Sequence, residues 1–212
     1  MKKLLLLLSL ALGTAFAQAQ VPAEVTAVMD KCRAAMVNPN GLEYEVDMKA
    51  GMGPLTMKMH FVVAEKGNLN RTAMTMKIMG VEATTESGFD GTDTWEISHS
   101  DGTDTITITK GDKRKKSKGD LSLDLDKKYR KAKMKLKDGY YEITFSEPKD
   151  SSCEAKSITV KISEKNYVMR EIRSGARGAK VTMVITKVRV GLRDSYFKLD
   201  LSKHPNAIVI RN

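Results

Sequence analysis

Apolar and polar side chains alternate along most of this chain from residue 42 onward. The alternation is regular in residues 42–49 and again in residues 55–63, with a turn containing Gly and Pro at 51–54 between them. Successive side chains of a β-strand point to opposite faces of a sheet, so a period of two predicts strands with one apolar and one polar face. These two segments are therefore predicted to form a hairpin with one buried face.

The same pattern recurs farther along the chain and predicts about eleven strands in all. The later strands are predicted at residues 72–79, 81–87, 94–97, 105–109, 140–146, 157–163, 166–173 and 179–190. So many strands with polar outer faces either stack as two sheets or curl into a barrel. The favoured fold is mainly β, a closed or half-open antiparallel barrel, and a sandwich is the alternative. Residues 121–133 are compatible with a short strand or a short helix.

An amphipathic helix is predicted over residues 22–36, before the first strand. Pro22 and Glu24 suit the first turn of a helix, where a backbone donor is not needed and negative charge is favourable. One face carries apolar residues at helical spacing, namely Val25, Val28, Met29, Cys32 and Met36. This stripe requires a surface to cover, and the mouth of a half-open barrel would accept the helix as part of a lid.

The N-terminus has the three parts of a cleavable secretory signal peptide. Lys2 and Lys3 precede an apolar stretch too short to anchor in a bilayer, and small residues follow at Ala17 and Ala19. Residues 1–19 are therefore predicted to be removed, leaving residues 20–212 as one domain without a linker. The mature chain is expected to be a soluble, monomeric protein of the periplasm.

The formal net charge of +10 raises the question of nucleic acid as a partner. Removal of Lys2 and Lys3 lowers this charge by two, to +8, and the basic stretch at residues 110–137 contains a single aromatic residue, Tyr129. Surfaces that bind nucleic acid combine positive charge with stacking aromatics or a recognised motif. We therefore expect no nucleic-acid partner. The basic stretch is either a solvated surface or a contact for anionic lipid or an acidic protein.

The sequence lacks a catalytic or metal-binding constellation. Its three histidines, His60, His99 and His204, stand at ligand spacing neither from one another nor from a cysteine. No nucleophile elbow, phosphate-binding loop or dinucleotide fingerprint is present. We therefore expect a protein that is not an enzyme and that holds no cofactor or metal.

Cys32 and Cys153 are the two cysteines of the chain. An exported protein meets an oxidising compartment, in which two cysteines can form a disulfide. The alternative is two unrelated thiols, and the sequence does not choose between these possibilities. No Cys-x-x-Cys motif points to redox catalysis.

Methionine is unusually frequent, with 13 residues against 5 Phe and 1 Trp. Several methionines fall on one alternating face of adjacent predicted strands. Met is flexible and polarizable, and it suits surfaces that accommodate varied apolar guests. The sequence therefore predicts an apolar cavity for acyl chains, with an ordinary flexible core as the alternative. The residues predicted to line this cavity are Leu42, Tyr44, Val46, Met57, Met59, Phe61, Met74, Met76, Ile78, Trp95 and Ile97.

Two short motifs and the order of the predicted elements are informative together. Residues 89–97 contain the pattern Asp-Gly-x-x-x-Trp before a hairpin, and residues 197–207 begin with Phe-x-x-Asp. With the signal peptide, the first helix and the antiparallel strands, these motifs resemble the LolA family of periplasmic lipoprotein carriers. The resemblance implies a half-open barrel of eleven strands whose concave apolar face is covered by helices. It also implies a carrier that accepts lipoprotein acyl chains from an inner-membrane ABC-type releasing complex and delivers them to an outer-membrane acceptor.

The sequence departs from that family at the lid. The family's arginine-proline pair, whose arginine holds the lid closed, has no match in the corresponding residues 63–71, where Lys66 or Arg71 could substitute. The family's apolar lid helices are replaced by the charged segment 110–137. The alternative function is therefore a periplasmic lipid-responsive sensor or protein-interaction module on the same scaffold, which does not shuttle lipid.

Overall fold

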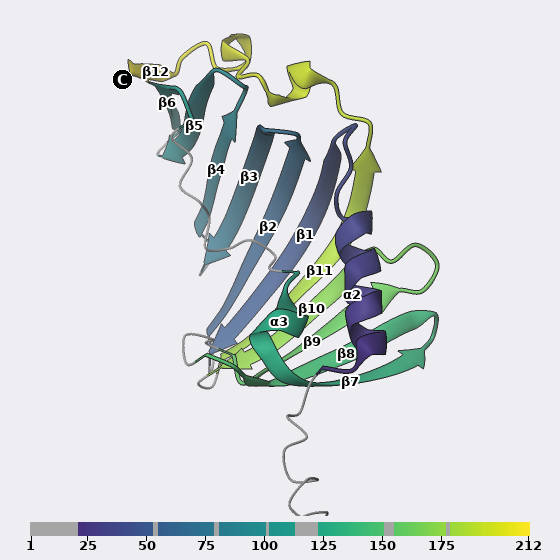
Figure 1. The fold of residues 1–212 in the computed structure, drawn as a ribbon. Helices are drawn as coiled ribbons and strands as arrows, with labels where there is room; N and C mark the ends of the chain where they lie inside the picture. Colours follow the sequence, from purple (N-terminus) through teal and green to yellow (C-terminus); the bar gives the residue numbers. More distant parts are fainter. Residues whose placement is uncertain are drawn as a thin grey trace, which may run out of the picture.

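The computed structural model describes residues 21–52, 55–78, 81–100, 102–112, 123–150, 155–176 and 179–212. The predicted signal peptide and Cys153 lie outside these ranges, so the cleavage stays a prediction, and both alternatives for Cys32 and Cys153, a disulfide or two unrelated thiols, stay open. Twelve strands form one sheet in the order β12-β6-β5-β4-β3-β2-β1-β11-β10-β9-β8-β7. The sheet curves around a concave side and stays open, with β7 and β12 as its two edges (Figure 1).

The strands are β1 (Leu42–Met52), β2 (Leu55–Lys66), β3 (Leu69–Ile78), β4 (Val81–Phe89), β5 (Asp93–Ser100), β6 (Thr103–Lys110), β7 (Tyr129–Lys137), β8 (Tyr140–Pro148), β9 (Ser157–Ser163), β10 (Met169–Ala176), β11 (Ala179–Val190) and β12 (Ile208–Arg211). The helices are α2 (Ala23–Ala35) and α3 (Leu125–Lys128), and the C-terminal segment has two 3-10 turns, η1 (Asp194–Phe197) and η2 (Leu201–Lys203). Neighbouring strands are antiparallel except β12 and β6, which are parallel. The predicted mainly β, half-open fold is confirmed. None of the helices in the described ranges is long and apolar enough to span a bilayer.

Two strands, β7 and β12, were not among those predicted from the sequence. Strand β7 begins directly after the single turn of α3, so residues 125–133 hold both a helical turn and part of a strand. Lysines alternate with Ala132, Met134 and Leu136 in this strand, so a period-two pattern is present there, but it lies inside the basic stretch for which a charged surface or lid is predicted. In β12 three apolar residues are consecutive, so this strand has no alternation to detect.

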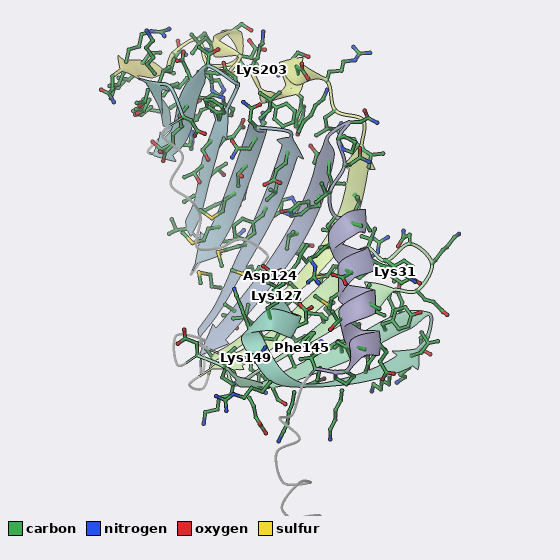
Figure 2. The ribbon with its side chains drawn as sticks, viewed as in Figure 1. Lys31, Asp124, Lys127, Phe145, Lys149 and Lys203 are labelled. Atoms are coloured by element: carbon green, nitrogen blue, oxygen red, sulfur yellow. The ribbon has the colours of Figure 1, made fainter. Side chains whose placement is uncertain are left out.

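Helix α2 lies over the β7–β10 half of the sheet, on its concave side (Figure 1). The predicted lid residues Val25, Val28 and Met29 are buried, and Met36 is half-buried at the C-cap. They pack in one core with side chains from β8, β9 and β10, among them Phe145, which is labelled in Figure 2. Full burial of an apolar side chain of this size contributes about 1.5–3 kcal/mol, so the contact fastens α2 to the sheet.

The two faces of the sheet are covered by different parts of the chain. We call the face that carries α2 the helix face and the opposite face the outer face. On β1, Val46 packs in the core with α2, whereas Glu43 accepts a hydrogen bond from Tyr196 of the C-terminal segment. Even and odd positions of a strand point to opposite faces, so the C-terminal segment lies on the outer face.

Trp95 anchors the C-terminal segment to the outer face. Its indole Nε1 donates to the carbonyl oxygen of Phe197 at 3.1 Å, and both side chains are buried. Gly88 is the direct partner of Trp95 on β4. A Cβ atom at Gly88 would lie 2.5 Å from the Trp95 ring, so only glycine leaves room for the indole at this position.

Candidate functional site

A continuous row of side chains crosses the helix face from β7 to β4. Successive cross-strand partners in this row are Met134, Ile143, Val160, Ile172, Met183, Met48, Met59, Met76 and Ala83. Directly opposed residues of neighbouring strands point to the same face, with their Cβ atoms about 4.5–5.5 Å apart. The row therefore joins the core under α2 to methionines on β11, β1, β2 and β3.

Burial changes along this row. Ile143 and Val160 are completely buried beneath α2, whereas Met48, Met59 and Met76 are only partly buried. Other partly buried residues flank these three on the same face. We call the whole group the Met face: Met48, Met57, Met59, Phe61, Met74 and Met76. It is an apolar surface that continues a covered core into a part of the sheet that α2 does not cover (Figure 1).

The residues predicted to line the cavity are distributed unevenly. Tyr44 is half-buried on the helix face beside the Met face, while Leu42 and Val46 are each only 4% exposed. The side chain of Ile78 lies outside the described residues. The structure brings together the predicted residues Met57, Met59, Phe61, Met74 and Met76. That these residues bind a ligand stays a prediction.

The prediction that Trp95 and Ile97 belong to the apolar face with the methionines is wrong. Cross-strand pairing connects Arg71 on β3 through Gly88 on β4 to Trp95 on β5, and all of these lie on the outer face. Trp95 and Ile97 are 2% and 7% exposed because they pack beneath the C-terminal segment. The alternation of β5 separates two sets of side chains correctly, but it does not say which set faces the helix.

Beside the Met face, the helix face carries hydroxyl groups on β4, β5 and β6, and the edge strand β12 then adds the exposed Ile208. In the row of cross-strand partners that contains Met74, the next residues are Thr85 on β4, Ser98 on β5 and Thr105 on β6. The Met face is therefore bounded by the core under α2 on one side and by hydroxyl groups on the other. Its methionines lie on β1, β2 and β3, so they span on the order of 10 Å across the sheet, given the strand spacing of about 4.8 Å.

A charged contact fastens the two covering helices to each other. Arg33 of α2 donates from Nη1 to Asp126 Oδ1 at 2.9 Å and from Nη2 to Asp126 Oδ2 at 3.1 Å. The same guanidinium donates to the carbonyl oxygen of Leu123 at 2.8 Å and to Asp30 Oδ1 at 2.6 Å. The hydrogen bond to Asp126 is the main cause that raises the pKa of Arg33 above its ordinary value. We call the bidentate pair of Arg33 and Asp126 the clamp.

Lys66 and Arg71, the two possible substitutes for the family's lid arginine, hold the C-terminal segment instead. Lys66 Nζ donates to the carbonyl oxygen of Leu192 at 2.9 Å. Arg71 Nη1 donates to the carbonyl oxygen of Tyr196 at 2.9 Å. Both contacts lie on the outer face, so the clamp, rather than either of these residues, joins the elements that cover the concave side.

A cavity of about 570 Å³ lies beneath the C-terminal segment on the outer face. Its wall includes Tyr196, whose ring lies 4.9 Å from the guanidinium carbon of Arg71 and 5.0 Å from that of Arg189. Burial, together with a hydrogen bond to Glu43, raises the pKa of Tyr196 to about 12. Arg189 pairs with Glu43 and Arg71 with Glu86, so these charges serve to fasten the C-terminal segment.

The histidines lie on the outer face beside carboxylates. His60 Nδ1 is 2.8 Å from Asp47 Oδ1. Asp104 bridges two histidines, with its oxygens 2.7 Å from His99 Nδ1 and 2.6 Å from His204 Nδ1. Within the described ranges, no three His, Cys, Asp or Glu side chains come together as metal ligands.

Cys32 is completely buried in the core under α2. Burial raises the pKa of its thiol to about 11. Since the thiolate is the reactive form of cysteine, Cys32 has little nucleophilic character at neutral pH.

Comparison with known proteins adds information at the level of fold. No protein-family model matches the sequence, and no curated protein matches it. LprF from Mycobacterium bovis is 9% identical to this chain, with 81% of this chain and 95% of that chain covered and a TM-score of 0.50. This likeness supports the open, mainly β fold described above. At this identity the likeness shows the fold alone.

Two further solved structures are similar at lower TM-scores. An uncharacterized conserved protein from Thermus thermophilus is 8% identical, covers 89% of this chain and 99% of its own, and has a TM-score of 0.48. A LolA superfamily protein from Nitrosomonas europaea is 10% identical, covers 82% of this chain and 97% of its own, and has a TM-score of 0.38.

Proposed function

We propose that this chain is a periplasmic lipid carrier that binds the acyl chains of lipoproteins on its Met face. The observation that carries the proposal is the partly exposed row of methionines, which continues the covered core under α2. The carrier would take its cargo from an inner-membrane ABC-type releasing complex and hand it to an outer-membrane acceptor, as the LolA resemblance implies. No catalytic step is part of the proposal.

The chemistry of the Met face supports reversible binding. Each buried methylene of an acyl chain contributes about 0.8 kcal/mol, so ten methylenes contribute about 8 kcal/mol before the cost of ordering the chain. That gain corresponds at most to a dissociation constant of about 1 μM, a range in which a carrier both holds and releases its cargo. Unbranched Met side chains can adjust to acyl chains of different length and shape.

Substitution of two opposed methionines tests the proposal. Met59 and Met76 are direct cross-strand partners at the centre of the Met face. The double variant Met59→Asp/Met76→Asp places two carboxylates where the acyl chain would lie, and burying them is strongly unfavourable. We expect binding of a fluorescent fatty acid, measured by titration, to fall by at least about tenfold.

A matched control lies on the same part of the sheet. Thr75 and Thr84 are cross-strand partners on the outer face, so Thr75→Asp/Thr84→Asp adds the same charges at the same spacing away from the Met face. This control should bind the fatty acid within about twofold of the unchanged protein. Equal binding by all three proteins, each folded by circular dichroism, would show that the Met face is not the binding site.

Native mass spectrometry separates the carrier from the alternative function. A carrier should copurify with lipid or take up added lipid, whereas a protein-interaction module on the same scaffold should do neither. Absence of lipid under both conditions would favour the sensor or interaction module.

A further inference from the structure

The outer face carries a row of cations on the same strands as the Met face. Successive cross-strand partners in this row are Lys133, Thr144, Thr159, Arg173, Thr182, Lys49, Lys58, Lys77 and Glu82. Three of the lysines are directly opposed on adjacent strands, Lys49 to Lys58 and Lys58 to Lys77. We call Lys49, Lys58 and Lys77 the lysine triplet.

The neighbouring row on the outer face shows how charges are normally arranged on such a sheet. There Lys135 lies 2.9 Å from Glu142, and Lys161 lies 3.5 Å from Glu142 and 3.3 Å from Glu171. Cations and carboxylates alternate across that row, so each charge has a partner. Within the described ranges, none of the lysines of the triplet forms an ion pair, and all three are exposed.

The arrangement of the lysine triplet does not stabilise the fold. Like charges that lie directly opposite each other on neighbouring strands are destabilising. The three side chains are exposed, so burial of their stems does not offset this repulsion. An anionic partner would convert the repulsion into attraction. The hydroxyl group of Thr182, the direct cross-strand partner of Lys49, lies beside the triplet and can donate a hydrogen bond to such a partner.

We propose that the lysine triplet docks the protein on the surface of a bilayer that contains anionic phospholipid. Neighbouring strands are about 4.8 Å apart, so the three lysines lie within about one Debye length at 0.1 M salt and act on a charged surface together. This inference goes beyond the proposed carrier function. It gives the protein a way to remain at a membrane while the Met face, on the opposite side of the sheet, is left free.

The residue types favour a lipid surface over a folded acidic protein. Lysine is a point charge on a flexible stem, which suits mobile headgroups, whereas Arg provides a rigid fork for a carboxylate held in a fixed position. The row contains one arginine, Arg173, and this residue is already paired with Glu171. The free cations are therefore all lysines.

Vesicle cosedimentation tests the proposal with the triple variant Lys49→Gln/Lys58→Gln/Lys77→Gln. The probes are vesicles of phosphatidylcholine alone and vesicles with about 30% phosphatidylglycerol, a composition that gives a negative surface. Each lysine near an anionic surface adds about a fivefold gain in partitioning, so the triple variant should bind the anionic vesicles about a hundredfold more weakly. The unchanged protein should bind them and should not bind neutral vesicles.

The matched control is Lys110→Gln/Lys165→Gln/Lys198→Gln, which removes the same net charge from three exposed lysines elsewhere. The proposal requires that this control keep most of its binding to anionic vesicles. An equal loss in both triple variants would show that net charge, and not the triplet, drives binding. Polyglutamate serves as a probe for an acidic protein partner. If the triplet variant bound vesicles as well as the unchanged protein but lost binding to polyglutamate, the lysine triplet would be a site for an acidic protein and not for a membrane. The Met59→Asp/Met76→Asp variant should still bind anionic vesicles, so this test and the carrier test fail independently.

Discussion

Substitution of Arg33 should lower the free energy of unfolding strongly, because it removes the contact that joins the covering helices α2 and α3. Its partner Asp126 has a side chain that is only 4% exposed, and both of its oxygens accept hydrogen bonds from Arg33. The variant Arg33→Met leaves that carboxylate buried without a partner. Breaking a buried pair in this way costs about 3–5 kcal/mol. Because the Arg33 side chain is itself 22% exposed, we expect a value near the lower limit, about 3 kcal/mol.

Substitution of the other partner, Asp126, should lower the free energy of unfolding much less. In Asp126→Asn, the guanidinium keeps its hydrogen bonds to Asp30 Oδ1 and to the carbonyl oxygen of Leu123. The asparagine side chain can still accept one hydrogen bond, so the expected loss is about 1 kcal/mol. In the double variant Arg33→Met/Asp126→Leu neither charge is left alone, and we expect a stability within about 1 kcal/mol of the unchanged protein.

Urea unfolding followed by circular dichroism measures the free energy of unfolding for each variant. Lys31→Met is the matched control on the same helix, because Lys31 makes exposed contacts to Tyr167, a hydrogen bond of 3.2 Å to its hydroxyl and an approach of 4.7 Å to the centroid of its ring. It should change stability by less than about 1 kcal/mol. The clamp would be refuted if Arg33→Met cost no more than this control, or if the double variant lost the sum of the two single losses.

Two further predictions concern the outer face. Lys58→Glu places a carboxylate between Lys49 and Lys77 and turns two repulsive cross-strand pairs into attractive ones, so it should raise the free energy of unfolding by about 1 kcal/mol. A destabilised Lys58→Glu variant would show that the three lysines are not neighbours. For Asp104, hydrogen bonds from His99 and His204 lower the pKa of the carboxyl group, so the unfolded state takes up its proton at a higher pH than the folded state does. The stability that this carboxylate contributes is thus present above the ordinary pKa of aspartate and is lost as the pH falls through the lowered one. Asp104→Asn should be less stable than the unchanged protein at neutral pH, and melting curves should converge in strong acid; a pH-independent difference would contradict this.

The period-two alternation was sufficient to predict the fold class and most strands. The first helix was also predictable, because Val25, Val28 and Met29 have helical spacing and all three are buried. Periodicity could not choose the face for Trp95 and Ile97. That choice depends on Gly88, which leaves space for the indole, and on the C-terminal segment about a hundred residues later, whose Phe197 carbonyl oxygen accepts the indole hydrogen bond.

The clamp could not be found from sequence for a related reason. Arg33 belongs to the polar side of an amphipathic helix, where charged residues are ordinary. Its partner Asp126 is 93 residues away, in a segment that is compatible with either strand or helix. Only the packing of α3 against α2 and β7 brings the two side chains together. The local sequence contains no signal that distinguishes this arginine from the other cations.

The Met face and the lysine triplet arise from one sequence pattern. Met and Lys alternate in Met48-Lys49, in Met57-Lys58-Met59 and in Met76-Lys77, and these segments lie on the adjacent strands β1, β2 and β3. A slip of one residue in the pairing would exchange the two faces and bring lysines toward the core under α2. The cost of burying those charges fixes the register. The same register separates an apolar surface from a cationic one by the thickness of a single sheet. Substitutions on the two faces should therefore affect acyl binding and vesicle binding separately, and their effects on stability should add.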